Sequence, residues 1–196
     1  MVMDAEEAKR LRRKMHYTKG ARFEAHKRLL VKYRLSLWSI SILSFYVICI
    51  SIGLLVFLGQ YDPNIGKYLT FLSVAMSVFI IILSLLNESN SYQSHSKSMH
   101  DCARDITRLY NSIPLSNKID EEYYKEKLRE YQIIIDKYDE NHESLDLLCH
   151  RFRDPFNGDE SVRFPYMQYF LNVYAWPIIY ILAPLIVVFI FFFARI

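Results

Sequence analysis

The chain has 196 residues, of which 52% are hydrophobic, and a formal net charge of +3. Its apolar residues are concentrated in three windows that lack Asp, Glu, Lys and Arg: Leu35–Tyr61, Tyr68–Asn87 and Phe164–Ala194. Each window has about the 20 residues that a helix needs to cross a ~30 Å hydrocarbon core. This distribution excludes a single soluble globular core. We expect no cleaved signal peptide, because the first window is too long and begins too far into the chain.

Charge is distributed unevenly along the chain. Residues 1–34 hold eleven Lys or Arg and four acidic residues, and are predicted to form a basic, largely helical arm. By the positive-inside rule, this arm places the N-terminus in the cytoplasm. Three spans then leave the C-terminus outside. The position of the arm beside a span favours anionic lipid headgroups over nucleic acid as its partner.

The first two windows are predicted to form a two-span transmembrane hairpin over residues 35–87. The segment between them, "GQYDPNIGK" at residues 59–67, is short and rich in turn-forming residues. It leaves no room for an extracellular domain. Trp38 and Tyr61 lie where interfacial aromatic belts form.

Residues 88–163 are predicted to be a cytoplasmic helical region with coiled-coil character. No helix breaker occurs before Pro114, so the second span is expected to continue as one helix. The following turn offers Ser116 or Asn117 as an N-cap. Apolar and aromatic residues then alternate at spacings of four and three, at Tyr124, Leu128, Tyr131, Ile135, Tyr138, His142, Leu145, Cys149 and Phe152. This heptad seam predicts one continuous helix, packed either against other copies or back onto residues 92–113.

Residues 164–196 are predicted to form a third transmembrane helix. Pro155, Gly158 and Pro165 end the preceding helix. Pro177 and Pro184 lie seven residues apart and predict a kink, because proline is tolerated in a span where neighbours satisfy the freed carbonyls. The first half of this segment is expected at the membrane interface.

A polar stripe follows one side of the second span. At about 100° per residue, one narrow sector contains Thr70, Ser73, Ser77, Ser84, Glu88 and Ser91, interrupted by Ile80 and Ile81. In one interpretation, these small residues let helices approach closely. In the other, the sector lines a water path in an oligomer. Glu88 then lies at the cytoplasmic mouth, and Ile80 and Ile81 form an apolar constriction that gates by dewetting.

Catalytic and metal-binding patterns are missing from the sequence. The five glycines are too scattered for a phosphate-binding loop. His95, His100 and Cys102 have no second set of ligands at matching spacing, so we expect no metal site. Cysteines at 49, 102 and 149 are expected to be reduced and buried rather than bridged. The sequence therefore predicts neither an enzyme nor a bound cofactor.

The layout resembles the SLATT family of two-span effector domains, which are associated with nucleotide-linked bacterial defence systems. The resemblance rests on the basic helix ending in "RFEAHKRLLVKYRLS", the short-turn hairpin, and the helix beginning "ESNSYQSHSKSMHDCARDITRLY". It covers roughly residues 8–150, and the third span departs from the two-span core. The resemblance implies a membrane effector that forms pores when a sensor activates it. It transfers no catalytic residues.

These observations predict an all-α membrane protein: a transmembrane helical hairpin, a cytoplasmic antiparallel helical pair, and a third, proline-kinked C-terminal transmembrane helix. The expected function is an oligomeric effector that permeabilises the inner membrane, so that an infected cell stops growing or dies. Its expected partners are the bilayer, other copies of itself, and a sensor or nucleotide-synthesising protein encoded nearby. Two alternatives remain: a membrane-anchored scaffold that recruits a soluble partner, and a constitutive small-ion channel.

Overall fold

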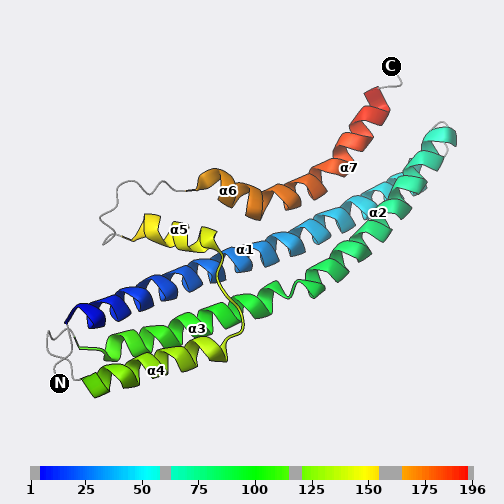
Figure 1. The fold of residues 1–196 in the computed structure, drawn as a ribbon. Coiled ribbons are helices and arrows are strands. Elements are labelled where there is room, and N and C mark those ends of the chain that lie inside the picture. The colour runs from blue at the N-terminus through cyan, green and yellow to red at the C-terminus, as the bar shows by residue number, and fades with distance from the viewer. Residues whose placement is uncertain (1–4, 58–62, 115–120, 155–164, 194–196) are drawn as a thin grey trace. The chain divides into compact units, whose positions relative to one another are not determined.

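The computed structural model describes residues 5–57, 63–114, 121–154 and 165–193. The described part of the chain is helical, with seven α-helices, one π-helical segment and no β-strand (Figure 1). The all-α prediction is confirmed.

Two compact units share these helices. The bundle unit consists of residues 1–30 and 93–169, and the span unit of residues 31–92 and 170–196. The predicted division into the segments 1–34, 35–87, 88–163 and 164–196 stays a prediction.

The structure contains three helical stretches that are long and apolar enough to cross a membrane: Lys9–Val56, Asn64–Ser112 and Met167–Ile186. At most 11% of the apolar window in each stretch is buried within the chain. Apolar side chains exposed in such numbers need lipid or protein neighbours, because monomeric soluble proteins rarely expose large apolar patches. The prediction of three candidate spans is confirmed.

In the span unit, two helices accompany the second part of α1 (Ala5–Phe57): α2 (Pro63–Ser89) and α7 (Trp176–Phe193). Leu43, Met76 and Leu83 form the buried core, and Tyr180 of α7 packs against it. The rings of Phe79 and Tyr180 also meet edge to face, with centroids 5.7 Å apart. The third candidate span thus packs on the first two.

Two short segments precede α7: α6 (Tyr166–Phe170) and a π-helical turn (Leu171–Ala175). Pro177 has no N–H and its ring would clash with the carbonyl of Val173 in a regular α-helix. The wider π-helical turn ends two residues before this proline, and its extra width leaves room for the proline ring beside the carbonyl of Val173.

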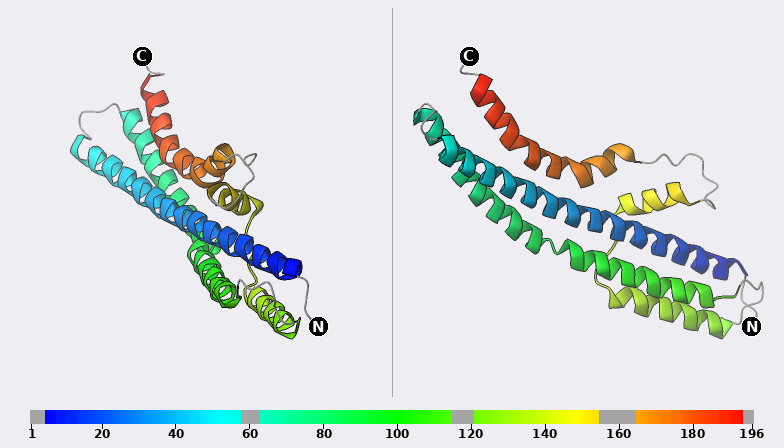
Figure 2. Two further views of the ribbon diagram at one scale, coloured as in Figure 1. Left: turned by 90° about the vertical axis from the view of Figure 1, so that its left-hand side faces the viewer. Right: turned by 180° about the vertical axis from the view of Figure 1, so that it is seen from behind.

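In the bundle unit, three helices surround the first part of α1: α3 (Tyr92–Ser112), α4 (Glu121–Lys137) and α5 (Ser144–Arg153). Figures 1 and 2 show α3 and α4 on one side of α1 and α5 on the other. Met15, Cys102, Ile106 and Tyr131 belong to the core that joins α1, α3 and α4.

The second span does not continue as one helix, contrary to the prediction. Helix α2 ends at Ser89 and α3 begins at Tyr92, with Ser91 between them at a φ of 46°. The backbone N–H and the hydroxyl of Ser91 both donate to the carbonyl of Glu88, at 3.1 and 3.2 Å. Short polar side chains compete with the helix for backbone hydrogen bonds, which explains a break within "ESNSY".

The heptad seam does not form one continuous helix, which is a second correction. Helix α4 ends at Lys137, residues 138–143 are not helical, and α5 begins at Ser144. Asp139 and Asn141 favour non-helical backbone, and a capping box between Glu143 and Asp146 starts a new helix. Apolar spacing does not reveal such a break, because the seam residues retain their period through it.

Several predicted features lie outside the described residues: Tyr61 and its part of the turn at 59–67, the N-cap candidates Ser116 and Asn117, and the breakers Pro155 and Gly158.

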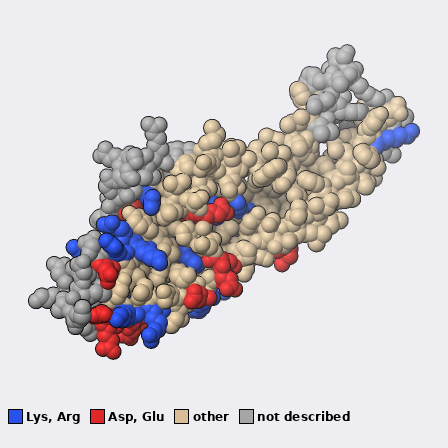
Figure 3. Space-filling view, viewed as in Figure 1, with Lys and Arg blue, Asp and Glu red and all other residues tan. Residues whose placement is uncertain are grey.

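Charged side chains are concentrated on the bundle unit. In the view of Figure 3, blue and red side chains cover its helices, whereas the surface of the span unit is almost wholly uncharged. This contrast is expected if the bundle faces water and the spans face lipid.

We expect reporter fusions after Phe152 and after Ile196 to report opposite sides of the membrane. If the Lys and Arg excess before Leu35 keeps the N-terminus in the cytoplasm, as the positive-inside rule predicts, the third span carries the C-terminus across. A fusion at Lys67, between the first two spans, serves as the control for the outside. If both test fusions report the cytoplasm, the third segment does not cross the membrane.

Candidate functional site

The polar stripe of α2 lies beside the face that packs against α1. Met76 and Leu83 are buried in that contact. The stripe residues Thr70, Ser84 and Glu88 are exposed, and Ser73 and Ser77 are half-buried. The stripe therefore ends at Glu88 on an outward-facing flank of the helix, since Ser91 has left the helical path. Other copies of the chain, lipid or water can reach this flank.

Stripe hydroxyls form hydrogen bonds within their own helix. Thr70 Oγ1 donates to the carbonyl of Gly66 at 2.8 Å, and Ser77 Oγ donates to that of Ser73 at 2.9 Å. In α1, Ser44 and Ser51 also donate to the carbonyl four residues earlier. These bonds satisfy the hydroxyl donors without another helix, while the oxygen lone pairs remain available to water or to a neighbouring helix.

The two isoleucines that interrupt the stripe have different surroundings. Ile80 packs against the buried core of the span unit. Ile81 is 60% exposed and faces away from that core. Of the two residues proposed for a constriction, only Ile81 lies on the open flank of α2.

A cavity of about 420 Å³ opens in the span unit where α1, α2 and α7 meet. Its lining combines apolar residues with the polar side chains of Lys32, Ser39, Asn87 and Asn172. The side-chain oxygen of Asn87 is buried there and has no hydrogen-bond partner among the described residues. A site of this size and polarity can hold water at one end of the spans. The sequence analysis did not identify it.

The seam residues pack within the chain. Tyr131 is buried in the core with Ile106, and its hydroxyl lies 3.0 Å from Thr18 Oγ1. Partly buried seam residues packed against the same core are Tyr124, Leu128, Ile135 and Tyr138. Of the remaining residues, His142 lies in the non-helical segment and Leu145 is buried on α5. The proposed role of the seam in oligomerisation stays a prediction.

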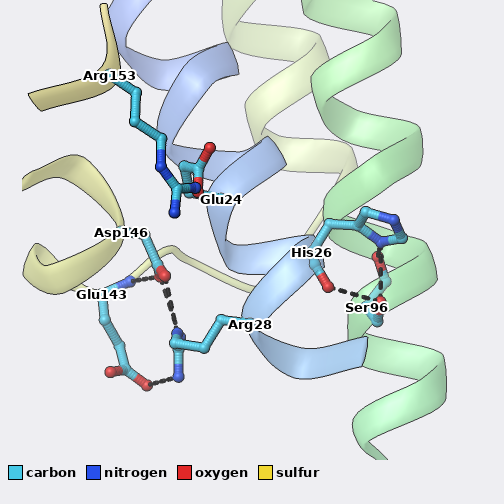
Figure 4. Close-up of polar contacts among 7 residues, drawn as sticks. All are labelled: Glu24, His26, Arg28, Ser96, Glu143, Asp146 and Arg153. Carbon is cyan, nitrogen blue, oxygen red and sulfur yellow. Dashed lines mark hydrogen bonds and ion pairs between the residues drawn. The ribbon is translucent and has the colours of Figure 1, made fainter. Parts of the chain in front are cut away.

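A set of polar contacts, here called a clamp, attaches α5 to α1 (Figure 4). It consists of Arg28 and Glu24 on α1, and of Glu143, Asp146 and Arg153 at α5. Arg28 donates through Nε and Nη2 to the two carboxylate oxygens of Asp146, at 2.8 and 3.0 Å. These side chains are only 3% and 2% exposed. Arg28 Nη1 also lies 2.9 Å from Oε1 of Glu143, in ion-pair contact but outside hydrogen-bond geometry. Arg153 pairs with Glu24 further along the same two helices.

Burial of Arg28 would by itself lower its pKa. Hydrogen bonding and charge from Asp146, and then charge from Glu143, outweigh burial and raise the pKa above its ordinary value. The guanidinium therefore stays charged in the interior. Buried, bidentate ion pairs depend on both partners, since either one alone is an uncompensated buried charge.

A second clamp attaches α3 to α1 on the other side. His26 Nδ1 lies 2.9 Å from the backbone carbonyl oxygen of Ser96 and 2.8 Å from Ser96 Oγ. Ser96 Oγ donates a hydrogen bond to the backbone carbonyl of His26 at 3.1 Å (Figure 4). Ser96 is buried. Together the two clamps hold the basic arm inside a helical bundle.

The sequence analysis missed these clamp residues. Arg28 is one of eleven basic residues in the arm, and Asp146 is one of sixteen acidic residues in the region that follows the second span. Neither belongs to a short motif. One weak local signal was available, because an acidic residue three positions after Glu143 suggests a helix start.

The long outward-facing apolar helices and the charged bundle define the chain as a helical membrane protein with a charged helical unit. It belongs to the SMODS and SLOG-associating 2TM effector domain family 5, because the model of that family matches residues 4–190. The matched region extends past residue 150 and includes the third candidate span, which the resemblance from sequence had left outside. No curated protein and no solved structure matches the chain.

Membership of this family makes the chain a membrane effector associated with defence systems. The family is described as an effector domain and is not a known catalytic family.

Proposed function

We propose that the chain assembles in the bacterial inner membrane and permeabilises it when a defence-system sensor activates the assembly. In this proposal the N-terminus and the bundle unit face the cytoplasm, and the C-terminus lies outside. Loss of the membrane barrier then stops growth of the infected cell or kills it.

The observation that carries the proposal is the polar flank of α2. Thr70, Ser84 and Glu88 are exposed on a helix that is otherwise apolar enough to cross the membrane. A lone span surrounded by lipid gains nothing from an exposed polar flank that ends in a carboxylate, since polar residues within spans usually face a bundle interior or water. Several copies that turn this flank inward would surround a wet path.

The bundle unit gives the proposed effector a place to receive its signal. Helix α1 includes residues of both the bundle and the first span, and in this proposal it carries the signal to that span. A sensor or nucleotide-synthesising protein encoded nearby is the proposed activator. We expect no direct contact with nucleic acid.

We expect Ser77→Leu to bring permeabilisation close to the background of cells that lack the protein. Leucine replaces a stripe hydroxyl with apolar bulk and favours dewetting of the path, while it makes the span more apolar and leaves insertion intact. The measurement is dye or ion leak from cells that express the activated system, together with the size of crosslinked oligomers.

The matched control is Ala75→Leu, which adds apolar bulk two residues earlier, on the exposed side of α2 opposite the stripe. We expect it to leak like the wild type. Ser77→Leu protein that assembles normally and still permeabilises cells would exclude this flank as a pore lining.

The internal hydrogen bonds of the stripe favour a second candidate, a membrane-anchored scaffold. The hydroxyls of Thr70 and Ser77 donate hydrogen bonds to carbonyls of their own helix. The stripe can therefore also pack against a helix of another copy with no water between them. A scaffold would show no ion flux after reconstitution of the purified protein with its activator. An activator-independent flux would instead indicate a constitutive channel.

A further inference from the structure

Two histidines and an aspartate from distant parts of the chain converge in the bundle unit. His16 lies on α1, His150 on α5, and Asp154 directly after α5. One ring nitrogen of each histidine and a carboxylate oxygen of Asp154 all lie within 4.8 Å of one another. Zn–N and Zn–O bonds of about 2.0–2.2 Å place two ligands of one ion roughly 3–4 Å apart. Small side-chain movements therefore bring all three groups onto one ion.

An ion pair accounts for only part of this cluster. His16 Nε2 and Asp154 Oδ2 are 2.7 Å apart, and the Asp154 side chain is only 4% exposed. His150 Nε2, in contrast, is buried without a hydrogen-bond partner among the described residues. A buried ring nitrogen of this kind calls for an explanation, and a metal ion at the cluster provides one.

The glycine beneath His150 shows that the position of this ring is built into α1. A Cβ atom at Gly20 would lie 2.1–2.4 Å from three atoms of the His150 ring. Glycine in a helix interior destabilises it by roughly 0.5–1 kcal/mol relative to alanine. Here its missing side chain is what lets the imidazole lie against α1, one helical turn after His16.

We propose that His16, His150 and Asp154 form a binding site for a transition-metal ion of the Zn²⁺ type. Two imidazole nitrogens and one carboxylate oxygen are a ligand set that Zn²⁺ accepts, with a fourth position left for water. The ion would tie α1 to the end of α5.

Charges around the cluster select the kind of ion. Arg12 and Lys19 lie over the ring of Tyr110, and Arg151 lies over the ring of Tyr17. This positive field opposes any cation, so the affinity must come from coordination bonds to neutral imidazoles. Hard ions such as Ca²⁺ and Mg²⁺ prefer oxygen ligands and are disfavoured.

The test is Zn²⁺ titration of the full-length protein in detergent, stripped of metal with a chelator and then competed against a chromophoric chelator. We expect one tight site per chain. His16→Gln and His150→Gln should each weaken Zn²⁺ binding by more than the roughly 10–100-fold that loss of an outer-shell partner costs. Excess Mg²⁺ or Ca²⁺ should not displace Zn²⁺.

Two control variants exclude other sources of zinc binding. His95→Gln removes an exposed histidine outside the cluster, and Cys149→Ala removes the buried thiol beside His150. Both should bind Zn²⁺ like the wild type. Circular dichroism and gel filtration of each variant verify that the fold is retained.

Gly20→Ala tests the geometry with all three ligands still present. Its methyl group should push His150 away from the cluster and weaken Zn²⁺ binding about 10–100-fold, as for other positioning residues. The electronic spectrum of bound Co²⁺ should change in the same variant. The proposal is overturned if the wild type binds no Zn²⁺, or if a folded His16→Gln or His150→Gln protein binds it as tightly as the wild type.

Discussion

Asp146→Ala is expected to destabilise the bundle unit by about 3–5 kcal/mol, because it leaves Arg28 as a buried cation without its bidentate partner. The two residues are 3% and 1% exposed, so water cannot replace the lost carboxylate. Asp146 also accepts a hydrogen bond from the backbone N–H of Glu143 at 2.9 Å, and this bond starts α5. The substitution therefore removes a helix start together with an ion pair. Denaturant unfolding of the detergent-solubilised protein measures the loss.

Two comparisons separate the buried pair from charge in general. Lys125→Ala breaks the exposed pair with Glu121 and should leave the unfolding midpoint close to that of the wild type, because water and salt screen surface ion pairs. The double variant Arg28→Met with Asp146→Leu should recover much of the stability, because apolar replacement of a whole buried pair is often neutral. If Asp146→Ala unfolds at the same denaturant concentration as Lys125→Ala, the clamp does not hold α5.

Ile81→Asn is expected to cause leak without the activating signal. Ile81 is exposed on the same flank of α2 as the stripe, where the proposed pore would be narrow and dry. If a polar side chain there lowers the free energy of wetting by about 2 kcal/mol, conductance rises roughly thirtyfold. The measurement is ion leak and growth of cells that express the variant without its activator.

Ile82→Asn is the matched control. It makes the same substitution one residue later, on a side of the helix that is 47% exposed and turned away from the stripe. Both variants place an asparagine at a similar depth, so any effect on membrane insertion is shared. Leak from Ile82→Asn equal to that from Ile81→Asn would show that polarity alone, and not the stripe flank, opens the membrane.

The sequence by itself determined the three candidate spans and the placement of the stripe. Both depend on local properties, since a run of about 20 apolar residues suffices to cross a membrane and helical geometry fixes which residues share a side. The resemblance to the SLATT family followed from the same layout, and family membership is confirmed. Even the basic arm and its helical character could be read locally.

Only the tertiary structure shows which charged and polar residues contact one another. The break at residues 138–143 lets α5 return to α1, although the period of the seam predicted one straight helix. The tertiary structure also brings Arg28 into contact with Asp146 and His16 into contact with His150, although the members of each pair are more than a hundred residues apart in the sequence. Such pairs follow no local period, because each member looks like any other charged or polar residue on a helix. The fold selects them by burial, where an unpaired charge costs far more than it does in water.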